Sequence, residues 1–224
     1  MSNAVTDIFD FWGQIGPTGY VHPADQNVFD RLGLDGHGFN HKTLPACFMG
    51  PLQTAPVVLL FMSPGLSPQD EALHKTKKYQ DYYVRRRQGN EPLPDVDMPG
   101  AKWWTERTKC FETDEIDAAR IALKLAVLNI GAYHSKEMND PELLAALPSS
   151  RVCLDWAQNV LFPAAESGER VVVCLRAAKF WGLRSEKKYK GTLFAPPVTR
   201  GGHMIRGPNR DKVIKAVRAA LSRK

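Results

Sequence analysis

The apolar run VVLLF at positions 57–61 constrains the fold more than any other feature of this sequence. It lies between Pro56 and Pro64, and a short β-rich run with such boundaries is typical of a strand buried on both faces of a parallel sheet. Similar runs follow at 126–130, 170–176 and 191–197, with helical patterns between them. Strands that alternate with helices predict an α/β protein with three layers, α/β/α, around a central, mostly parallel, four-stranded sheet.

The helical segments can be bounded from their apolar spacing and their capping residues. Asp114 is expected to cap a helix at 115–125, and Ser149 or Ser150 to open one at 149–167. The remaining helices are expected at 71–88, 102–111, 141–148, 177–183 and 209–224, the last with a clear apolar face.

A chain of 224 residues fits one domain. Residues 1–50 are rich in Gly, Pro, His and aromatic residues without periodicity. We therefore expect a loop-rich arm packed on the core, with a short helix at 5–12, followed by an α/β domain at 51–224. No apolar run approaches the roughly 18 residues of a membrane span, and the first residues do not resemble a signal peptide. These features predict a cytoplasmic protein without membrane contact.

The four cysteines, Cys47, Cys110, Cys153 and Cys174, form no CxxC pair and no Cys/His cluster. This spacing predicts reduced thiols and no metal site. The chain also lacks the phosphate-binding loop GxxxxGK(S/T) and the dinucleotide motif GxGxxG. We therefore expect no cofactor bound by these loops.

Positive charge is concentrated at the C-terminal end of the chain. Residues 171–224 contain 14 Lys or Arg and two acidic residues, a net charge of +12, whereas residues 1–170 carry a net charge of −6. Such an asymmetry is typical of a chain that binds a polyanion such as nucleic acid. Solvated terminal helices can have the same composition, so the charge alone does not decide between the two interpretations.

The carboxyl ends of parallel strands meet at one edge of a sheet, where ligands bind in α/β proteins. The segments that follow the predicted strands are Met62-Ser63-Pro64-Gly65, NIGAYHS at 129–135, Arg176 and a loop at 195–210. We expect the functional site at this edge.

In this arrangement the chain resembles the uracil-DNA glycosylase superfamily over roughly residues 50–224. The segment FMSPG at 61–65 is similar to the Gly-X-Asn-Pro-Gly or Gly-Glu-Ala-Pro-Gly turn after the first strand of that superfamily. The segment VLN at 127–129 is similar to its Leu-Asn motif, and a Val-rich third strand and a proline-containing fourth loop follow in the same order. The resemblance implies binding of DNA or another nucleic acid and, in DNA repair, hydrolysis of the N-glycosidic bond of an extruded, damaged or deaminated base, without a cofactor or a metal.

Two positions depart from the superfamily pattern. Where the first turn carries a carboxylate or an asparagine, this chain has Ser63, or Met62 in the other alignment, and where the last loop carries His-Pro-Ser it has 195–197, Ala-Pro-Pro. A hydroxyl can orient water by hydrogen bonding, whereas a carboxylate can also polarise it. A catalytically inactive module that binds nucleic acid or a nucleotide, and a small-molecule nucleoside hydrolase, are therefore the alternatives.

Each candidate residue has a functional and a structural interpretation. Ser63 can orient the attacking water, or it can simply favour the turn before Pro-Gly. Asn129 can contact a base edge or satisfy loop backbone, Tyr133 can stack on the base, and His134 or His203 can act as the electrophile. Met62, Pro64, Gly65 and Ser135 complete the expected substrate-binding set.

The basic loop TRGGHMIRGPNR at 199–210 contains candidates for backbone binding. Its arginines Arg200, Arg206 and Arg210 can grip phosphates, and Met204-Ile205 can form an apolar wedge in a base stack. A mobile basic hairpin is the alternative. Elsewhere, Asp70, seven residues after Ser63, can be an acid near the site or a residue favoured at the start of a helix, and we prefer the second interpretation. Trp103 and Trp104 are interpreted as packing residues.

Overall fold

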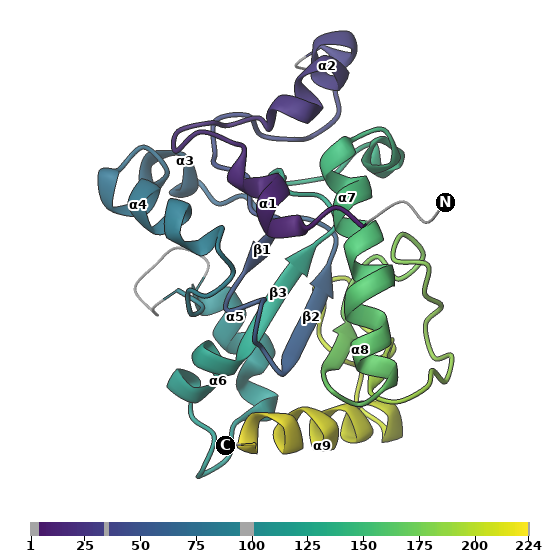
Figure 1. The fold of residues 1–224 in the computed structure, drawn as a ribbon. Helices are drawn as coiled ribbons and strands as arrows, with labels where there is room; N and C mark the ends of the chain where they lie inside the picture. Colours follow the sequence, from purple (N-terminus) through teal and green to yellow (C-terminus); the bar gives the residue numbers. More distant parts are fainter. Residues whose placement is uncertain (1–4, 34–35, 95–100, 224) are drawn as a thin grey trace.

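The computed structural model describes residues 5–33, 36–94 and 101–223. Its sheet consists of β1 (Phe48–Met49), β2 (Val57–Phe61), β3 (Leu125–Asn129), β4 (Val171–Cys174) and β5 (Leu193–Phe194), in the spatial order β1-β3-β2-β4-β5. β2 pairs in parallel with β3 and β4, β4 pairs in parallel with β5, and β1 pairs antiparallel with β3 (Figure 1). The predicted α/β class is confirmed. The sheet is mixed and has five strands rather than four, because β1 has only two residues and no pattern by which a sequence reveals a strand.

The central strands β2, β3 and β4 are buried along their whole length, because their side chains point alternately into two apolar layers. One layer is covered by α1 (Ile8–Gly13), α7 (Pro148–Trp156) and α8 (Phe162–Glu166). The other is covered by α6 (Ala118–Lys124) and α9 (Pro208–Ser222). Figure 1 shows these helices on both sides of the sheet, with the strands between them.

The segment predicted as an arm packs on this core. Asp7 caps α1, and the ring of His22 caps α2 (Pro23–Leu32) by accepting a hydrogen bond from the Ala24 amide. Trp12 and Phe29 are buried in the same apolar layer as α7. The first part of the chain therefore covers one face of the sheet and ends in β1.

Several predicted helices have different limits. The expected helix at 71–88 is two helices, α3 (Asp70–Leu73) and α4 (Lys77–Arg86), because the Thr76 side chain caps α4 by accepting from the Tyr79 amide. α6 is capped by Asp117 and not by Asp114. α7 begins at Pro148, before the two serines that were expected to open it, since proline is favoured at a first helical position.

The remaining helical segments are also less regular than predicted. The segment 102–111 forms α5 (Ala101–Thr108) and a 3₁₀ turn, and a single π-helical turn (Ala157–Leu161) separates α7 from α8. The segment 141–148 contains a 3₁₀ helix (Pro141–Ala145), and 177–183 forms turns with Ala177 at φ 59°. Within the described residues, no helix is long and apolar enough to cross a membrane.

Candidate functional site

A cavity of about 780 Å³ opens where β2 and β3 end. It collects several of the predicted site residues at the edge of the sheet where ligands are expected. Those that line it are Met62, Ser63, Pro64, Gly65, Asn129, His134, Ser135 and Arg200.

The loops after β2 and β3 run side by side along this cavity. Gly131 N donates to Met62 O at 2.7 Å, and Ser135 N donates to Pro64 O at 3.0 Å. A Cβ atom at position 131 would lie 2.7 Å from the end of the Leu144 side chain and 3.2 Å from Met62 O, so glycine avoids crowding where the two loops approach each other. These contacts fix the Met-Ser-Pro-Gly turn against the AYHS segment.

The hydroxyl groups of Ser63 and Ser135 meet across these loops, with their oxygens 3.1 Å apart. Ser135 is almost fully buried and Ser63 is partly exposed. One hydroxyl donates to the other, so the pair still has a hydrogen and lone pairs with which to bind water or a polar substrate atom.

Asn129 is the last residue of β3 and directly precedes the loop that follows this strand. Its Nδ2 donates to Ala46 O at 2.9 Å, which fixes the amide plane and is the structural role anticipated for it. No described residue donates a hydrogen bond to its Oδ1. Because Asn129 also lines the cavity, its amide supplies an acceptor there in addition to its structural contact.

The imidazole of His134 ties the two loops together. Its Nδ1 lies 2.7 Å from Gly65 O, and since a carbonyl only accepts, Nδ1 carries the proton. Burial lowers the pKa of His134 to about 4, against the raising effects of Gly65 and Asp70, so the ring is neutral at pH 7. Its Nε2 is buried without a hydrogen-bond partner among the described residues.

A second neutral histidine, His74, packs edge-on to His134 with ring centroids 5.1 Å apart. Burial, and then the charges of His134 and Arg86, lower the pKa of His74 to about 2. Its Nδ1 accepts from Leu44 N at 2.7 Å, which anchors the ring. Neither histidine is a cation in the resting site at neutral pH.

Asp70 lies in the wall of the cavity and is 8% exposed. It is the first residue of α3, as the sequence predicted, and its Oδ2 accepts a hydrogen bond from Ser67 N. Both interpretations of Asp70 therefore apply, because the residue begins α3 and its side chain also lines the cavity.

Aromatic rings form another wall. Phe61 packs edge-on against Trp103 and Trp104, with centroids 5.1 and 5.5 Å away, and all three rings line the cavity. The two tryptophans therefore pack, as expected, and also border the site. Arg107 stacks on Trp103, 3.7 Å from the ring centroid, and its Nε and Nη2 donate to Gly201 O. This contact fixes the loop at 199–204 over the cavity.

Arg176 and Arg200 are the basic residues of the 171–210 segment that line the cavity. Gly202, at φ 79°, holds this loop close to Phe61, whose ring a side chain at 202 would meet at 3.1 Å. His203 and Arg206 are exposed and lie outside the lining, and so does Arg210, which lies 4.0 Å from Asp211. These three residues therefore lie on the surface around the cavity and not in its lining.

Tyr133 corrects the sequence analysis. Its side chain is 0% exposed and does not line the cavity. Its hydroxyl donates to Asp25 Oδ2 at 2.6 Å and accepts from His22 N at 3.2 Å, and its ring packs edge-on to Phe29. Tyr133 is therefore a core residue that joins α2 to the strand loop, and its ring is not available to stack on a base.

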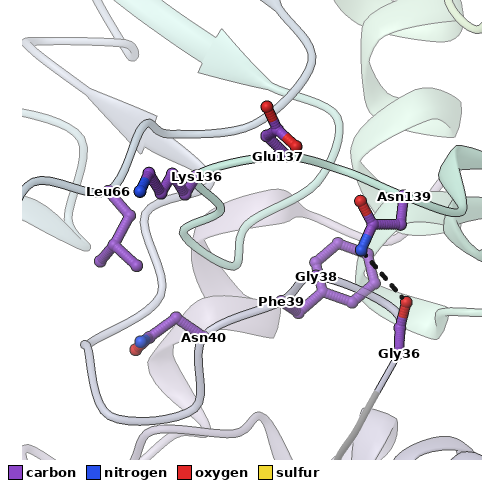
Figure 2. Close-up of a pocket in the computed structure, with 8 residues that line it drawn as sticks. All are labelled: Gly36, Gly38, Phe39, Asn40, Leu66, Lys136, Glu137 and Asn139. Carbon is purple, nitrogen blue, oxygen red and sulfur yellow. Dashed lines mark hydrogen bonds between the residues drawn. The ribbon is translucent and has the colours of Figure 1, made fainter.

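A second pocket of about 500 Å³ adjoins the cavity and shares Leu66, Lys136, Glu137 and Asn139 with it. Figure 2 shows Leu66 and Lys136 close together on one side of this pocket, and Asn139 on the other side bonded to Gly36 O. The candidate site thus continues along the surface beyond the cavity itself.

The described residues contain no cluster of three or more His, Cys, Asp or Glu side chains that could hold a metal ion. The fold and the site define an α/β protein with a polar and aromatic cavity at the carboxyl edge of its parallel strands. Comparison of the chain with protein-family models, curated proteins and solved structures finds no match.

Proposed function

We propose that this protein has a uracil-DNA glycosylase-like fold, binds nucleic acid, and hydrolyses the N-glycosidic bond of a damaged or deaminated base in the 780 Å³ cavity. The observation that carries the proposal is the pairing of Ser63 with Ser135 in a cavity that Asn129 and Asp70 also line. This combination provides hydroxyls for a water molecule, an amide for a base and a carboxylate for developing positive charge.

The cavity has the features that a nucleobase requires. Its volume lies within the range of about 300–1,000 Å³ found for small-molecule pockets. The rings of Phe61, Trp103 and Trp104 give it flat apolar surface, and Asn129 Oδ1 gives it an acceptor for a base N–H. Enzymes that act on extruded bases combine such apolar surfaces with polar contacts to the base edge.

The proposed reaction uses water as the nucleophile. Ser63 and Ser135 orient the water, and the Asp70 carboxylate stabilises positive charge on the sugar and accepts a proton from the water. The bond between C1′ and the base nitrogen breaks, its electron pair stays with the base, and the water oxygen bonds to C1′. The proton taken from the water is returned to the departed base, so atoms and charges balance.

The surface around the cavity supports a polyanionic substrate. Arg176 and Arg200 line the cavity, and Arg206 is exposed on the same loop as Arg200. Ile205 is 48% exposed, whereas Met204 packs into the apolar layer of α9, so Ile205 alone is suited to the role of an apolar wedge.

A binding module without catalysis is the second candidate, and one observation favours it. Asn129 Nδ2 is already bound to Ala46 O, and the group beside the turn is a hydroxyl, which polarises water less than a carboxylate. In that case the same cavity binds a base and releases it unchanged.

The test is an abasic-site assay with single- and double-stranded oligonucleotides that contain uracil or hypoxanthine. We expect base release by the wild-type protein and a loss of about 10²- to 10³-fold in rate for Asp70→Asn. Asp81→Asn is the matched control, because Asp81 is exposed and pairs with Lys77 on α4. Absence of release with tight, salt-dependent binding would establish the binding module, and release unaffected by Asp70→Asn would remove Asp70 from the mechanism.

A further inference from the structure

A small cavity, here the α1–α4 cavity, lies between the first segment of the chain and the end of α4. Its lining consists of Trp12, Pro45, Cys47, Phe48, Tyr83, Arg86 and Arg87. Arg86 is the one described residue that this cavity shares with the larger cavity at the ends of β2 and β3. The centre of a water-sized sphere has about 10 Å³ within it, which is room for one water molecule or one small ion.

Three hydrogen-bond donors in this lining have no acceptor among the described residues. They are Trp12 Nε1, the Tyr83 hydroxyl and Arg87 Nε. Their side chains are only 2%, 1% and 9% exposed, so bulk water does not satisfy them. Burial raises the pKa of Tyr83 to about 12, against the lowering effect of Arg87, so the phenol keeps its proton and can donate. Buried donors without an acceptor are unfavourable, and three of them line one cavity.

Two positive charges lie in the same lining. Arg86 donates to a backbone carbonyl, and Arg87 donates to Ile15 O and Gly16 O. Neither guanidinium forms an ion pair with a carboxylate of the described residues. Their carbons lie 4.8 and 4.3 Å from the ring centroid of Tyr83, whose face stabilises positive charge without cancelling it. The described groups therefore leave both charges without an opposite charge.

The chemistry of this lining distinguishes an anion from water. A water molecule also has two hydrogens to donate, and Pro45 O, an acceptor in the lining, already accepts from Arg86 Nη2 at 3.2 Å. An anion accepts from every side and supplies the missing opposite charge. We infer that the α1–α4 cavity binds one small monovalent anion, such as chloride, between Trp12, Tyr83 and the two arginines.

This site would fasten the first segment of the chain to α4. Trp12 belongs to α1, Cys47 and Phe48 lie at β1, and Tyr83 belongs to α4, so the anion contacts segments that are distant in the sequence. The unfolded chain does not bring these segments together. Binding of the anion must therefore stabilise the folded protein. The inference is independent of the proposed function and involves no step of the reaction.

The test follows the thermal unfolding midpoint of the full chain while chloride replaces gluconate, an anion too large for the cavity. The total ionic strength stays constant, and chloride rises to about 0.5 M. Above the dissociation constant, we expect the midpoint to rise by about 3–5 °C for each tenfold increase in chloride. A midpoint that does not rise with chloride would overturn the inference.

The variant Tyr83→Phe assigns the effect to the α1–α4 cavity, because it removes one donor and keeps the ring. We expect its dissociation constant for chloride to be about 10- to 100-fold larger than that of the wild-type protein. Tyr82→Phe is the matched control and should keep the wild-type affinity, since Tyr82 lies on the same helix and its hydroxyl bonds Pro92 O outside this cavity. Unchanged chloride affinity in a folded Tyr83→Phe variant would overturn the inference.

A second pair of variants serves if Tyr83→Phe does not fold. Trp12→Phe removes the indole donor and should likewise weaken chloride binding. Trp156→Phe is its control, because Trp156 is buried in the same apolar layer and does not line the cavity. Equal chloride dependence in these two variants would overturn the inference.

Bromide locates the ion directly, since it resembles chloride and scatters X-rays anomalously. In crystals of the full chain kept in bromide, we expect an anomalous peak within hydrogen-bonding distance of Trp12 Nε1 and Arg87 Nε. Bromide peaks confined to the protein surface would overturn the inference, and would attribute any rise of the midpoint to weak binding at exposed cations.

Discussion

The hydroxyl oxygens of Ser63 and Ser135 lie 3.1 Å apart, although the two residues are separated by 72 positions in the sequence. The contact exists because β2 and β3 are parallel neighbours, so that their following loops leave the sheet at the same edge. The backbone bond from Ser135 N to Pro64 O holds the two loops in this register. The pair is therefore a direct product of the sheet topology.

Removing either hydroxyl should slow base release. Ser63→Ala and Ser135→Ala each leave one hydroxyl to orient the water, so we expect a decrease of about 10- to 100-fold in single-turnover rate with little change in stability. Ser167→Ala is the matched control, since the Ser167 hydroxyl is exposed and bonds Ala164 O within its own turn. Equal rates for all three variants would show that the pair takes no part in the reaction.

Asn129 should matter for stability as well as for recognition. Asn129→Ala leaves the buried Ala46 O without its side-chain donor, and a buried unsatisfied group costs about 1–3 kcal/mol. We expect the urea midpoint to fall by a corresponding amount, together with loss of base binding. A variant with full stability and no base binding would mean that the bond to Ala46 contributes nothing to the fold.

Tyr133→Phe should destabilise the protein and leave the chemistry intact. The substitution removes the donor to the buried carboxylate of Asp25, so we expect a loss of about 1.5–3 kcal/mol in the free energy of unfolding. Base release measured well below the unfolding temperature should be unchanged. A stable Tyr133→Phe variant with impaired release would instead place this residue in the site.

Stability should fall in mild acid because burial lowers the pKa of several histidines, most of all His134 and His74. The folded-state pKa is about 4 for His134 and about 2 for His74, against an ordinary value of 6.5. Below about pH 6.5 these histidines become protonated in the unfolded chain but stay neutral in the folded chain. Each of them therefore lowers the free energy of unfolding by up to about 1.4 kcal/mol per pH unit as the pH falls towards 4. The measurement is the urea midpoint between pH 7 and pH 5.

The double variant His74→Gln, His134→Gln isolates this effect from the carboxylates, which also respond to acid. It should be less stable than the wild-type protein at pH 7 and should lose less of its stability on acidification. Parallel pH profiles of the two proteins would contradict the assignment.

Nucleic-acid binding should weaken as salt rises, with a slope that reflects the arginines at the cavity. If Arg200 contacts a phosphate, Arg200→Gln should reduce the slope of log K against log salt by about 1. Lys215→Gln, at an exposed position of α9, is the control and should leave the slope unchanged. Binding that is indifferent to salt would rule out a phosphate-dominated interface.

The sequence predicted the parts of the site that depend on strand order. Val57–Phe61 and the segment 125–129 are apolar runs followed by polar turns, so both strands and the edge where Ser63, Asn129 and Ser135 meet could be deduced. Strand pairing follows from local pattern and topology rules, and residues directly after strands inherit their position from it.

The parts that were missed or wrong depend on contacts distant in the sequence. Arg86 belongs to an RRR run that is typical of a solvated helix end, yet it is buried beside Tyr83 of its own helix and donates to Pro45 O, which is distant in the sequence. Tyr133 looked available for stacking because nothing in its own segment indicates the buried Asp25 of α2. For Asp70 the sequence allowed a helix start or a place in the site, and only the fold of the turn before it shows that both apply.

The central claim is that nucleic acid binds at the carboxyl edge of β2 and β3, and hydrogen–deuterium exchange tests it most directly. Exchange is compared with and without a uracil-containing oligonucleotide, with an undamaged oligonucleotide of the same length as control. We predict slower exchange at 62–66, 129–136 and 199–206, greater with the uracil-containing strand than with the control. Protection confined to other segments, or no protection at saturating oligonucleotide, would contradict the claim.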